Sequence, residues 1–489
     1  MAKGVTPQSS DYSKWYTDVI TKAELADYGP VKGTMVIRPY GYSIWESVKD
    51  EFDKEFKNTG HVNAYFPLFI PKSFLAKEAE HVEGFAKECA VVTHSKLKVD
   101  ENNNLVTDPN SKLEEEIIVR PTSETVIWSM YKKWINSYRD LPILINQWAN
   151  VVRWEMRTRL FLRTSEFLWQ EGHTAHSSEK EAQDEALKIL NIYQKVVEGV
   201  MGIPVLTGYK SDSEKFAGAI DTYCIEAMMG DKKALQAGTS HYLGQNFAKA
   251  FDVKFQNEEN KEEYVYATSW GVSTRLIGAL IMVHGDDKGL RLPPKVAPIQ
   301  VVIVPIFKSD EDKEKIIKYI EPLIDDLKNL NIRFLFDDRN KISPGFKFNE
   351  WEMKGVPIRI EVGLRDMEDN IIVYSRRDKD GKNKLPILNS SSFIKETLND
   401  IQISLFNQAK EFQTNNTHNV STYSEFQSII SSGGFVICGW DGSRETEEKI
   451  KQETKSTIRC IPFDQDIENL NCIYSGNKAK YKVIFSKSY

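Results

Sequence analysis

The stretch RWEMRTRLFLRTSEFLWQEGHTAH, residues 153–176, decides how the first part of this sequence is interpreted. It places four arginines, three glutamates and two histidines among Trp, Phe and Leu side chains. Charges in that number do not stabilise an apolar segment, because each loses several kcal/mol of hydration on burial unless it is paired. We therefore expect this stretch to form part of a ligand-binding site.

Two β-type runs lie in and just before this stretch, and we expect them to pair as a hairpin. The run VVRWE (151–155) ends in Arg153 and Glu155, and the second run opens at Arg163. Because alternate residues of a strand share a face, Arg153 and Glu155 are expected to point the same way. The same rule places three residues of the second run on one face: Trp169, Glu171 and His173. Guanidiniums beside carboxylates and aromatic walls suit a ligand with polyanionic and cationic groups, whereas an edge hairpin with surface ion pairs is the alternative.

A second arginine strengthens the interpretation as a ligand site. The segment ATSWGVSTRLIGALIMVHGDDKGLRLPP (267–294) predicts a strand, a turn at Gly271 and a helix that carries Arg275. Small residues at such a turn let a ligand approach the backbone closely. A single helix arginine is more often a solvated surface residue, but together with the first cluster Arg275 is interpreted as part of the same site.

Length, composition and charge limit the class of protein. A chain of 489 residues with 41% apolar and 27% charged residues is expected to fold into two to four globular domains. No apolar run approaches the roughly 18 residues of a membrane span, and the first residues lack an apolar signal core. Five scattered cysteines suit a reducing compartment, so we expect a cytoplasmic protein without membrane contact. The net charge of −6 means that nucleic-acid binding would require local basic patches.

Three regions of different texture follow one another along the chain. Residues 1–295 combine strands at uneven spacing with helical stretches, which predicts an α+β domain on a mostly antiparallel sheet. After a proline-rich linker, residues 296–404 alternate apolar strands with helices, which predicts a small α/β domain. Residues 405–489 are expected to form a small α+β C-terminal domain.

These motifs together resemble a class II aminoacyl-tRNA synthetase, and specifically a prolyl-tRNA synthetase of the archaeal/eukaryotic type. Residues 41–71 are similar to motif 1, which builds the dimer interface in the family, residues 151–173 to motif 2, and residues 269–278 to motif 3. RPTSET (120–125) matches the substrate loop, and residues 216–247 match the rest of the pocket. The resemblance covers nearly the whole chain, with no insertion large enough for an editing domain between motifs 2 and 3.

The resemblance implies an enzyme that activates L-proline with ATP, giving prolyl-adenylate and pyrophosphate, and then transfers the prolyl group to the 3′ end of tRNA(Pro). It implies a homodimer, ATP and Mg²⁺ as cofactors, and a role in cytoplasmic protein synthesis. The proline carboxylate would attack the α-phosphorus in line, so that positioning and charge neutralisation by the protein dominate catalysis.

Individual roles are carried over from the family's motifs. Three arginines are implied to grip the phosphates and thereby catalyse: Arg153, Arg163 and Arg275. The implied proline site comprises Thr122, Glu124, Arg153, Trp169, Glu171, His173, Phe216, His241 and Ser273. The implied ATP site comprises Arg153, Glu155, Arg163, Gln236, Thr239 and Arg275, with Glu155 and Glu226 as possible ligands of a metal or of the ribose. For Trp169 and Phe216 a plain core position is the alternative, and for Thr239 a structural cap.

The region 296–404 resembles the anticodon-binding domain that several class II synthetases share. Its most informative run is PGFKFNEWEMKGVPIRIEVGLRD (344–366). Unpaired bases need stacking surfaces and hydrogen-bonding edges. The residues implied to supply them are Phe348, Glu352, Arg359, Arg365 and Asp366, although some of these could instead be core residues or surface ions.

The C-terminal cysteine pattern and Ser165 depart from the family pattern, whereas the terminal tyrosine follows it. Relatives often carry a four-cysteine zinc site in the C-terminal domain, whereas here three thiols remain and serines stand at two ligand positions: Cys438, Cys460, Cys472, Ser443 and Ser475. A structural zinc site needs four ligands, so zinc is not expected. Ser165 replaces an arginine of the motif 2 loop. The terminal tyrosine of the family points its carboxylate toward the active site, which Tyr489 is expected to do here.

Two other functions compete with proline ligation. Specificity for threonine or another small amino acid is one, but threonine recognition in the sister family uses a cysteine/histidine zinc site that this sequence lacks. A catalytically inactive, tRNA-sensing regulator on the same fold is the other. Such descendants typically lose the phosphate-gripping arginines, and all three are present here.

Overall fold

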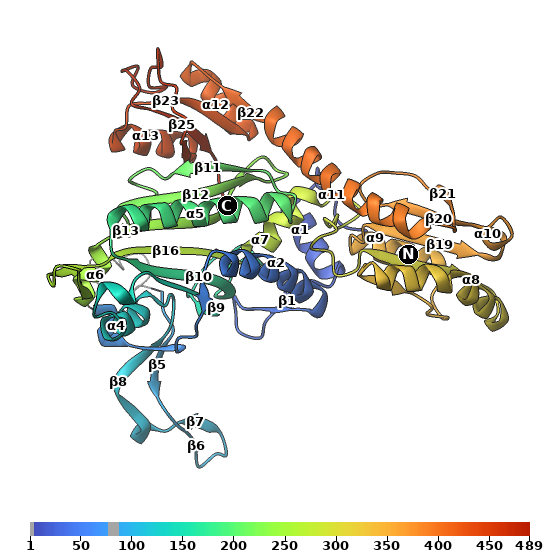
Figure 1. The fold of residues 1–489 in the computed structure, drawn as a ribbon, viewed down its shortest axis with the longest axis horizontal. Helices are drawn as coiled ribbons and strands as arrows, with labels where there is room; N and C mark the ends of the chain where they lie inside the picture. Colours follow the sequence, from blue (N-terminus) through green and yellow to red (C-terminus); the bar gives the residue numbers. More distant parts are fainter. Residues whose placement is uncertain (1–3, 77–87) are drawn as a thin grey trace.

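The computed structural model describes residues 4–76 and 88–489. Figure 1 shows a central sheet region, a second α/β region on the right, and a C-terminal region stacked above the central sheet. A long helix, α11 (Ser390–Asn415), runs from the second region to the third. All helices within the described ranges are too short or too polar to cross a lipid bilayer.

The central sheet is antiparallel except at one edge. Its strands follow the order β11-β12-β13-β16-β10-β9-β3, and only β3 pairs with β9 in parallel. In chain order they are β3 (Val62–Asn63), β9 (Ile143–Val152), β10 (Glu166–His176), β11 (Val205–Tyr209), β12 (Asp221–Met228), β13 (Ala234–Gly244) and β16 (Tyr266–Ser273). The predicted α+β fold class with a mostly antiparallel sheet is therefore confirmed.

The hairpin predicted around residues 151–173 is present, but the loop between its strands is longer than expected. β9 ends at Val152 and β10 begins at Glu166, so Arg153, Glu155 and Arg163 all lie in the connecting loop. The expectation that Arg153 and Glu155 share a strand face is wrong. The Arg153 N–H still donates to the Ser165 carbonyl oxygen at 2.8 Å, but the Ser165 N–H donates to the Gly33 carbonyl oxygen and the Trp154 N–H to that of Glu88, so the two strands separate there.

Helix α5 (Glu179–Gly199) covers one face of this sheet. Its start is fixed by a capping box, in which Ser178 accepts from the Glu181 N–H and Glu181 reaches back to the Ser178 N–H. Its apolar stripe includes Ile189, Tyr193 and Val196, all buried in the largest core cluster of the described residues. The opposite face of the sheet is thereby left for the loops that carry polar side chains.

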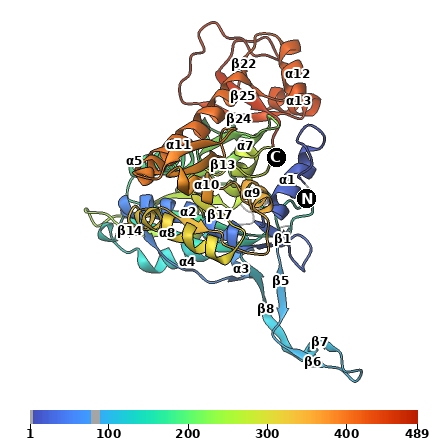
Figure 2. The ribbon, with the colours of Figure 1, turned by 90° about the vertical axis from the view of Figure 1, so that its right-hand side faces the viewer.

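Further helices and strands lie in the described part of residues 1–295. The remaining helices are α1 (Tyr12–Lys22), α2 (Pro39–Asn58), α3 (Lys72–Ala76), α4 (Glu124–Trp134), α6 (Asn246–Phe251) and α7 (Arg275–His284). The remaining strands are β1 (Ala26–Tyr28), β2 (Met35–Ile37), β4 (Phe69–Pro71), β5 (Val91–His94), β6 (Leu97–Val99), β7 (Leu105–Thr107), β8 (Lys112–Val119), β14 (Lys254–Gln256) and β15 (Glu262–Tyr264). Figure 2 shows β5 and β8 leading into an arm, tipped by β6 and β7, that projects from the body.

The second region has a five-stranded sheet in the order β18-β17-β19-β20-β21. The first three strands of this order are parallel and the last two are antiparallel. Its elements are β17 (Val301–Ile306), α8 (Asp310–Asn329), β18 (Phe334–Phe336), α9 (Pro344–Met353), β19 (Ile358–Gly363), α10 (Leu364–Glu368), β20 (Ile371–Arg376) and β21 (Asn383–Pro386). Strand β17 is buried on both faces, as its continuous apolar run VVIV predicts.

The third region extends the central sheet. Its strands follow the order β22-β23-β25-β24, and β24 pairs with β11, so that one sheet of 11 strands results. Its elements are β22 (Thr417–Asn419), α12 (Tyr423–Ser432), β23 (Phe435–Trp440), α13 (Arg444–Thr454), β24 (Thr457–Pro462) and β25 (Tyr481–Ser486). The expected division at residue 404/405 falls inside α11, and it stays a prediction.

Gly172 is required by close packing inside the central sheet. A Cβ atom at this position would lie 2.1 Å from Cζ2 of the buried Trp270 ring. We expect Gly172→Ala to destabilise the protein by about 1–3 kcal/mol through overpacking, measured as a lowered unfolding midpoint in urea. Gly199→Ala is the control, because nothing lies within 4 Å of its Cβ position at the end of α5. Equal midpoints for the two variants would contradict this packing argument.

Candidate active site

A cavity of about 260 Å³ opens on the face of the central sheet opposite α5: Trp169, Glu171 and His173 of β10 line it, whereas Tyr193 of α5 donates to Gln170 on the other face. Most of the side chains predicted for the proline and ATP sites line it. They are Thr122, Glu124, Arg153, Trp169, Glu171, His173, Phe216, Gln236, Thr239, His241, Ser273 and Arg275. The structure thus brings together residues that span more than 150 positions of the sequence.

Strand register explains why these residues meet. On β10, alternate residues face the cavity, and their partners on β16 are the cavity residues Ser273, Gly271 and Ser269. On β13, Thr239 and His241 stand opposite Gly271 and Ser269. The period of two therefore carries one row of side chains across three adjacent strands, as the sequence pattern predicts for Trp169, Glu171 and His173.

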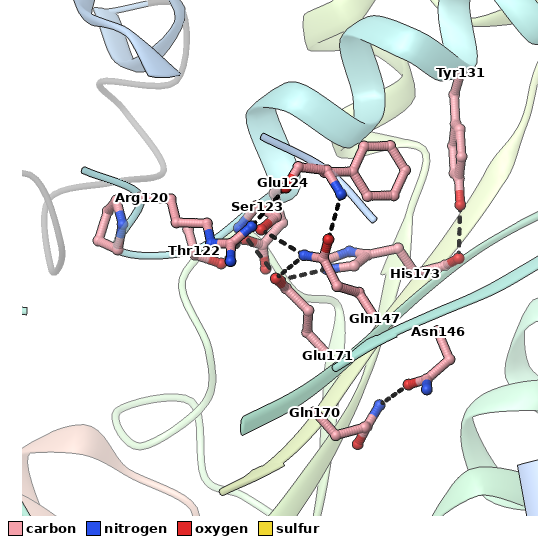
Figure 3. Close-up of polar contacts among 12 residues, drawn as sticks. Arg120, Thr122, Ser123, Glu124, Tyr131, Asn146, Gln147, Gln170, Glu171 and His173 are labelled. Atoms are coloured by element: carbon pink, nitrogen blue, oxygen red, sulfur yellow. Dashed lines mark hydrogen bonds and ion pairs between the residues drawn. The ribbon is translucent and has the colours of Figure 1, made fainter. Parts of the chain in front are cut away.

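A hydrogen-bond network fixes the acidic end of the cavity (Figure 3). Glu171, which is 2% exposed, accepts from Gln147 Nε2 at 2.9 Å and from the Ser123 N–H at 3.2 Å. His173 Nε2 lies 3.0 Å from Glu171 Oε2, and Tyr131 donates to the His173 carbonyl oxygen. Strands β9 and β10 and the loop before α4 are thereby joined at one carboxylate.

Glu171 and His173 form a buried charged pair. Burial alone would raise the pKa of Glu171, but the hydrogen bond and charge of His173 outweigh it, and the pKa lies below its ordinary 4.5. Burial alone would lower the pKa of His173, but the bond to Glu171 and the charge of Glu124 outweigh it, and the pKa lies above 6.5. Glu124 is the second carboxylate at this end, and its charge contributes to the raised pKa of His173.

Glu124 stands at the start of α4, where Thr122 donates a short hydrogen bond to its carboxylate. Ligand atoms of Glu124, Glu171 and His173 all lie within 4.8 Å of one another. Such a compact group of acidic oxygens beside an imidazole suits a small cation, including an ammonium group. The sequence prediction that Thr122 and Glu124 face the same group as Glu171 therefore has a geometric basis.

Aromatic rings close the pocket beside this acidic group. The Phe216 ring lies 4.6 Å from the His241 ring, and His241 Nδ1 lies 3.0 Å from Thr222 Oγ1. Burial, followed by the charge of His173, lowers the pKa of His241 to about 3, so this imidazole is neutral. The neutral His241 ring and the Phe216 ring form a wall suited to an apolar ring.

Arg153 leads from the acidic end toward the basic end. Its Nε donates to the Pro121 carbonyl oxygen at 3.0 Å, and its guanidinium lies 5.3 Å from the Trp169 ring centre. Burial lowers its pKa, while the carboxylates of Glu124 and Glu171 act in the opposite direction. An arginine held by backbone and by an aromatic face is preorganised to contact an anion.

Arg275 occupies the basic end, at the first residue of α7. Its Nε donates to the Leu162 carbonyl oxygen at 3.2 Å. Burial, and then the charges of Arg163 and Arg153, lower its pKa to about 10. The repulsion that lowers the pKa of Arg275 in this way favours a polyanionic ligand, which would remove it.

Two predicted ATP residues lie outside the cavity wall. Arg163 is half-exposed on the loop between β9 and β10, 3.8 Å from the carboxylate of Glu155. Its charge nevertheless acts on Arg275, so it stands near the basic end. The loop position reflects the early end of β9 described above.

The prediction that Glu226 could bind a metal or the ribose is wrong. Glu226 is fully buried and accepts from Lys210 at 2.6 Å and from Arg459 at 3.0 Å. Two cations already neutralise its charge, and it is not among the residues that line the cavity. These residues therefore do not fit an Mg²⁺ site, because Glu226 has no free charge and Glu155 lies beside Arg163.

The residues predicted for anticodon contact separate into two groups. Glu352 and Arg359 line a second cavity of about 190 Å³, and the Arg359 guanidinium lies 4.4 Å from the Phe348 ring centre. Further basic residues line the same cavity: Lys288, Arg376, Arg377, Lys379 and Lys382. Arg365 and Asp366 lie apart in the short helix α10, where Asp366 accepts from the Gly363 N–H as a cap.

The last residue of the chain lies near the loop between β9 and β10. The Tyr489 ring centre is 5.3 Å from the guanidinium of Arg159 in that loop. Its hydroxyl donates to Asp231 at 2.7 Å, and its N–H bonds to the Ala234 carbonyl oxygen. These contacts fix the ring, while the expected direction of its carboxylate stays a prediction.

The three C-terminal thiols belong to two different places. Cys438 and Cys472 are buried in the core of the third region, whereas Cys460 lies against Cys224 of the central sheet. Ser443 caps α13, and Ser475 donates to Asp441 at 2.6 Å.

Gln147 and Ser123 are functional positions that the sequence reasoning missed. Gln147 is fully buried, and its amide donates to Glu171 and also to Ser123 Oγ at 3.1 Å. The available signal was the pair of adjacent amides, Asn146 and Gln147, inside a strand whose other residues, except Asn150, are apolar. A buried amide must be hydrogen-bonded, so its position alone points to a polar network.

The charged pair gives a testable pH dependence. We expect His173 to titrate above pH 6.5 and its pKa to fall in Glu171→Gln, because burial is then less opposed. Its contribution to folding stability is present below about pH 6.5 and is lost as the pH rises through the raised pKa; that of Glu171 is lost as the pH falls through its lowered pKa. NMR titration of histidine-labelled protein measures the pKa of His173 in the wild type and in Glu171→Gln. The His173→Gln variant identifies the His173 resonance.

His284 is the internal control for this titration. It is buried elsewhere against the Met201 carbonyl oxygen, where burial lowers its pKa to about 4, and we expect this pKa to be unchanged in both variants. A wild-type His173 pKa at or below 6.5, or one that Glu171→Gln leaves in place, would show that the two groups do not form a charged pair.

Comparison with known proteins gives the family. Residues 105–284 match the tRNA synthetase class II core domain (G, H, P, S and T), residues 300–397 the anticodon binding domain, and residues 423–489 the prolyl-tRNA synthetase C-terminal domain. Relatives named proline--tRNA ligase from Bacteroides fragilis, Flavobacterium psychrophilum and Porphyromonas gingivalis are 57%, 56% and 55% identical. Each alignment covers 100% of this chain and at least 99% of the relative. The family resemblance drawn from the motifs is therefore confirmed, and the chain belongs to the prolyl-tRNA synthetase family of class II aminoacyl-tRNA synthetases.

Proposed function

We propose that this chain ligates proline to tRNA(Pro) in two steps, with prolyl-adenylate as the intermediate. The observation that carries the proposal is the polarity of the cavity: an acidic group with aromatic walls at one end, and two converging arginines at the other. An imino acid with one cationic nitrogen and a triphosphate fit these two ends. The family membership and the full-length relatives supply the reaction.

Proline binds at the acidic end. Its secondary ammonium is held by Glu124 and Thr122, with Glu171 and His173 forming the floor. The pyrrolidine ring lies against Trp169 and Phe216. His241 and Ser273 make the remaining contacts of the proline site. Glu171 and His173 are paired with each other, so Glu124 is the carboxylate assigned to the ligand's ammonium at this end.

ATP binds at the basic end. Arg153 lies between the two ends and contacts both the proline carboxylate and the α-phosphate. Arg275 and Arg163 hold the outer phosphates and the adenine, with further contacts from Gln236, Thr239 and Glu155. Mg²⁺ bound to the nucleotide would supply neutralisation of phosphate charge. The chain's own residues orient the carboxylate and α-phosphorus in line and stabilise the added charge of the transition state.

The second region binds the tRNA anticodon. Its support is the basic cavity lined by Glu352 and Arg359, beside the Phe348 ring, which offers a stacking face and hydrogen-bonding edges. Arg365 and Asp366 belong to the proposed contact surface as well, at the exposed end of that region. Base contacts of this kind give specificity while the neighbouring lysines and arginines bind phosphate.

The proposal extends to domain organisation, localisation and oligomeric state. The chain divides into a catalytic domain (1–295), an anticodon-binding domain (296–404) and a C-terminal domain (405–489), which is the archaeal/eukaryotic type of architecture. It acts in the cytoplasm as a homodimer formed through the motif 1 segment. Apolar side chains of this segment are exposed, including Val62 (60%), Tyr65 (72%) and Phe69 (49%), which supports a partner surface there.

Proline-dependent exchange of pyrophosphate into ATP tests the reaction. We expect exchange with proline, and a loss of about a hundredfold or more in Arg153→Ala with an unchanged melting temperature, because a charge contact to the reacting groups is removed. Arg139→Ala is the control, since Arg139 is exposed and lies outside the cavity. Exchange with threonine alone, or none with any amino acid in the panel, would overturn the proposed function.

The proposed C-terminal domain is held without zinc. Its support is the use of Ser443 as a helix cap, of Ser475 as a donor to Asp441, and the position of Cys460 against Cys224. We expect metal analysis of purified protein to find well under one zinc per chain. A chelator should leave the melting temperature unchanged; one zinc per chain would contradict the serine argument.

A further inference from the structure

One wall of the proline pocket is a loop that is held in place by contacts with the C-terminal region. We call residues 210–216, between β11 and β12, the wall loop. Glu214, Lys215 and Phe216 of this loop line the cavity. The loop belongs to no helix or strand, so a few backbone hydrogen bonds and the contacts of its side chains hold it.

The first contact is a buried hydrogen bond. Ser211 Oγ donates to Glu447 Oε1 of helix α13 at 2.7 Å. Ser211 is 1% exposed and Glu447 is 4% exposed, so water does not compete for this bond. Glu447 stands in the first turn of α13, where the helix dipole stabilises its charge.

Arg459 of strand β24 makes the second set of contacts. Its carbonyl oxygen accepts from Lys210 Nζ at 2.8 Å, and its guanidinium lies 3.6 Å from Glu214 Oε2. The same guanidinium bonds to Glu226 in the central sheet at 3.0 Å. Arg459 is 6% exposed, so its charge is committed to these carboxylates.

Three side chains of the wall loop are anchored to the C-terminal region. Lys210, Ser211 and Glu214 are held by Arg459 or Glu447, and the backbone of Tyr209, just before the loop, pairs with Ile461. The central sheet holds the end of the loop, where the Phe216 N–H donates to Thr222 Oγ1 at 3.1 Å and the Phe216 ring packs against His241. Phe216 is thus tied to the C-terminal region through the preceding residues of the loop, by contacts made more than 230 residues later in the sequence.

We propose that Glu447 and Arg459 are positioning residues, through which the C-terminal region sets the affinity for proline by fixing the wall loop and Phe216. This inference rests on the proposed function, since it assigns proline to the pocket that Phe216 closes. Neither residue lines the cavity, so neither touches the substrate.

The effect should be selective for the amino acid. Gln236 and Thr239 lie on strand β13, which pairs with β12 and β16, and Arg275 is anchored by the loop between β9 and β10. The nucleotide end is therefore held without the wall loop. Loosening the loop weakens the wall around the proline ring and leaves the ATP contacts in place.

A double-mutant cycle on the buried hydrogen bond tests this proposal in the full-length protein. We expect Ser211→Ala and Glu447→Ala each to raise the KM for proline about tenfold in the exchange assay. The KM for ATP and kcat should stay within about twofold. The double variant should resemble either single variant, because both remove the same bond.

Two further variants separate positioning from general stability. Glu447→Gln keeps an oxygen acceptor for Ser211 and should retain most of the affinity for proline. Glu453→Ala, on the same helix, removes contacts only to Tyr423 and Tyr474 and should behave as the wild type. Hydrogen exchange should show lost protection confined to residues 210–216 in Glu447→Ala.

The outcomes distinguish the two proposals. An active wild type whose Ser211→Ala and Glu447→Ala variants keep the wild-type KM for proline overturns the positioning role alone. A rise of both KM values together with a fall in kcat also overturns it, because general destabilisation then explains the loss. A wild type without proline-dependent exchange refutes the proposed function itself.

Discussion

The arrangement of the cavity depends on one buried carboxylate, that of Glu171 in the middle of β10. A charged group in this position is stable only if hydrogen bonds and an opposite charge replace its hydration. The replacements come from separate segments: His173 on the same strand, the Gln147 amide on β9, and the Ser123 N–H before α4. Because a single charge must satisfy all of them, their relative positions are set before a ligand binds. The bond from the Ser123 N–H to Glu171 also holds Thr122 and Glu124, on either side of Ser123, against the sheet.

This constraint also explains why the cavity has two electrostatic ends. Glu171 is paired with His173, and Glu124 is the second carboxylate on one side. On the other side, Arg153 lies close enough to Arg275 for its charge to lower the pKa of Arg275. An anionic ligand would offset the repulsion between these guanidiniums. A ligand pair with one ammonium and several phosphates complements both ends of the cavity.

Features with a local cause could be predicted from the sequence, and features with a distant cause could not. The row of β10 side chains facing the cavity follows from the period of a strand, and the capped helix α5 from its own residues. The end of β9 was misplaced because the N–H groups of Trp154 and Ser165 bond to Glu88 and Gly33, which are distant in the sequence, and not across the hairpin. Glu226 resembled a ligand by its type and place, but its partner Arg459 lies 233 residues away. Gln147 was missed because its role exists only once Glu171 is beside it.

The Glu226 cluster also explains how the C-terminal region is attached. β24 continues the central sheet through β11, and Arg459 on β24 shares the carboxylate of Glu226 with Lys210. Separating the two parts would leave buried charges unpaired, which is far more costly than losing an exposed ion pair. The region is thus secured by the sheet and by this cluster, at some distance from Cys438 and Cys472. A metal at those thiols would stabilise the region internally, but the attachment that reaches the wall loop does not depend on one.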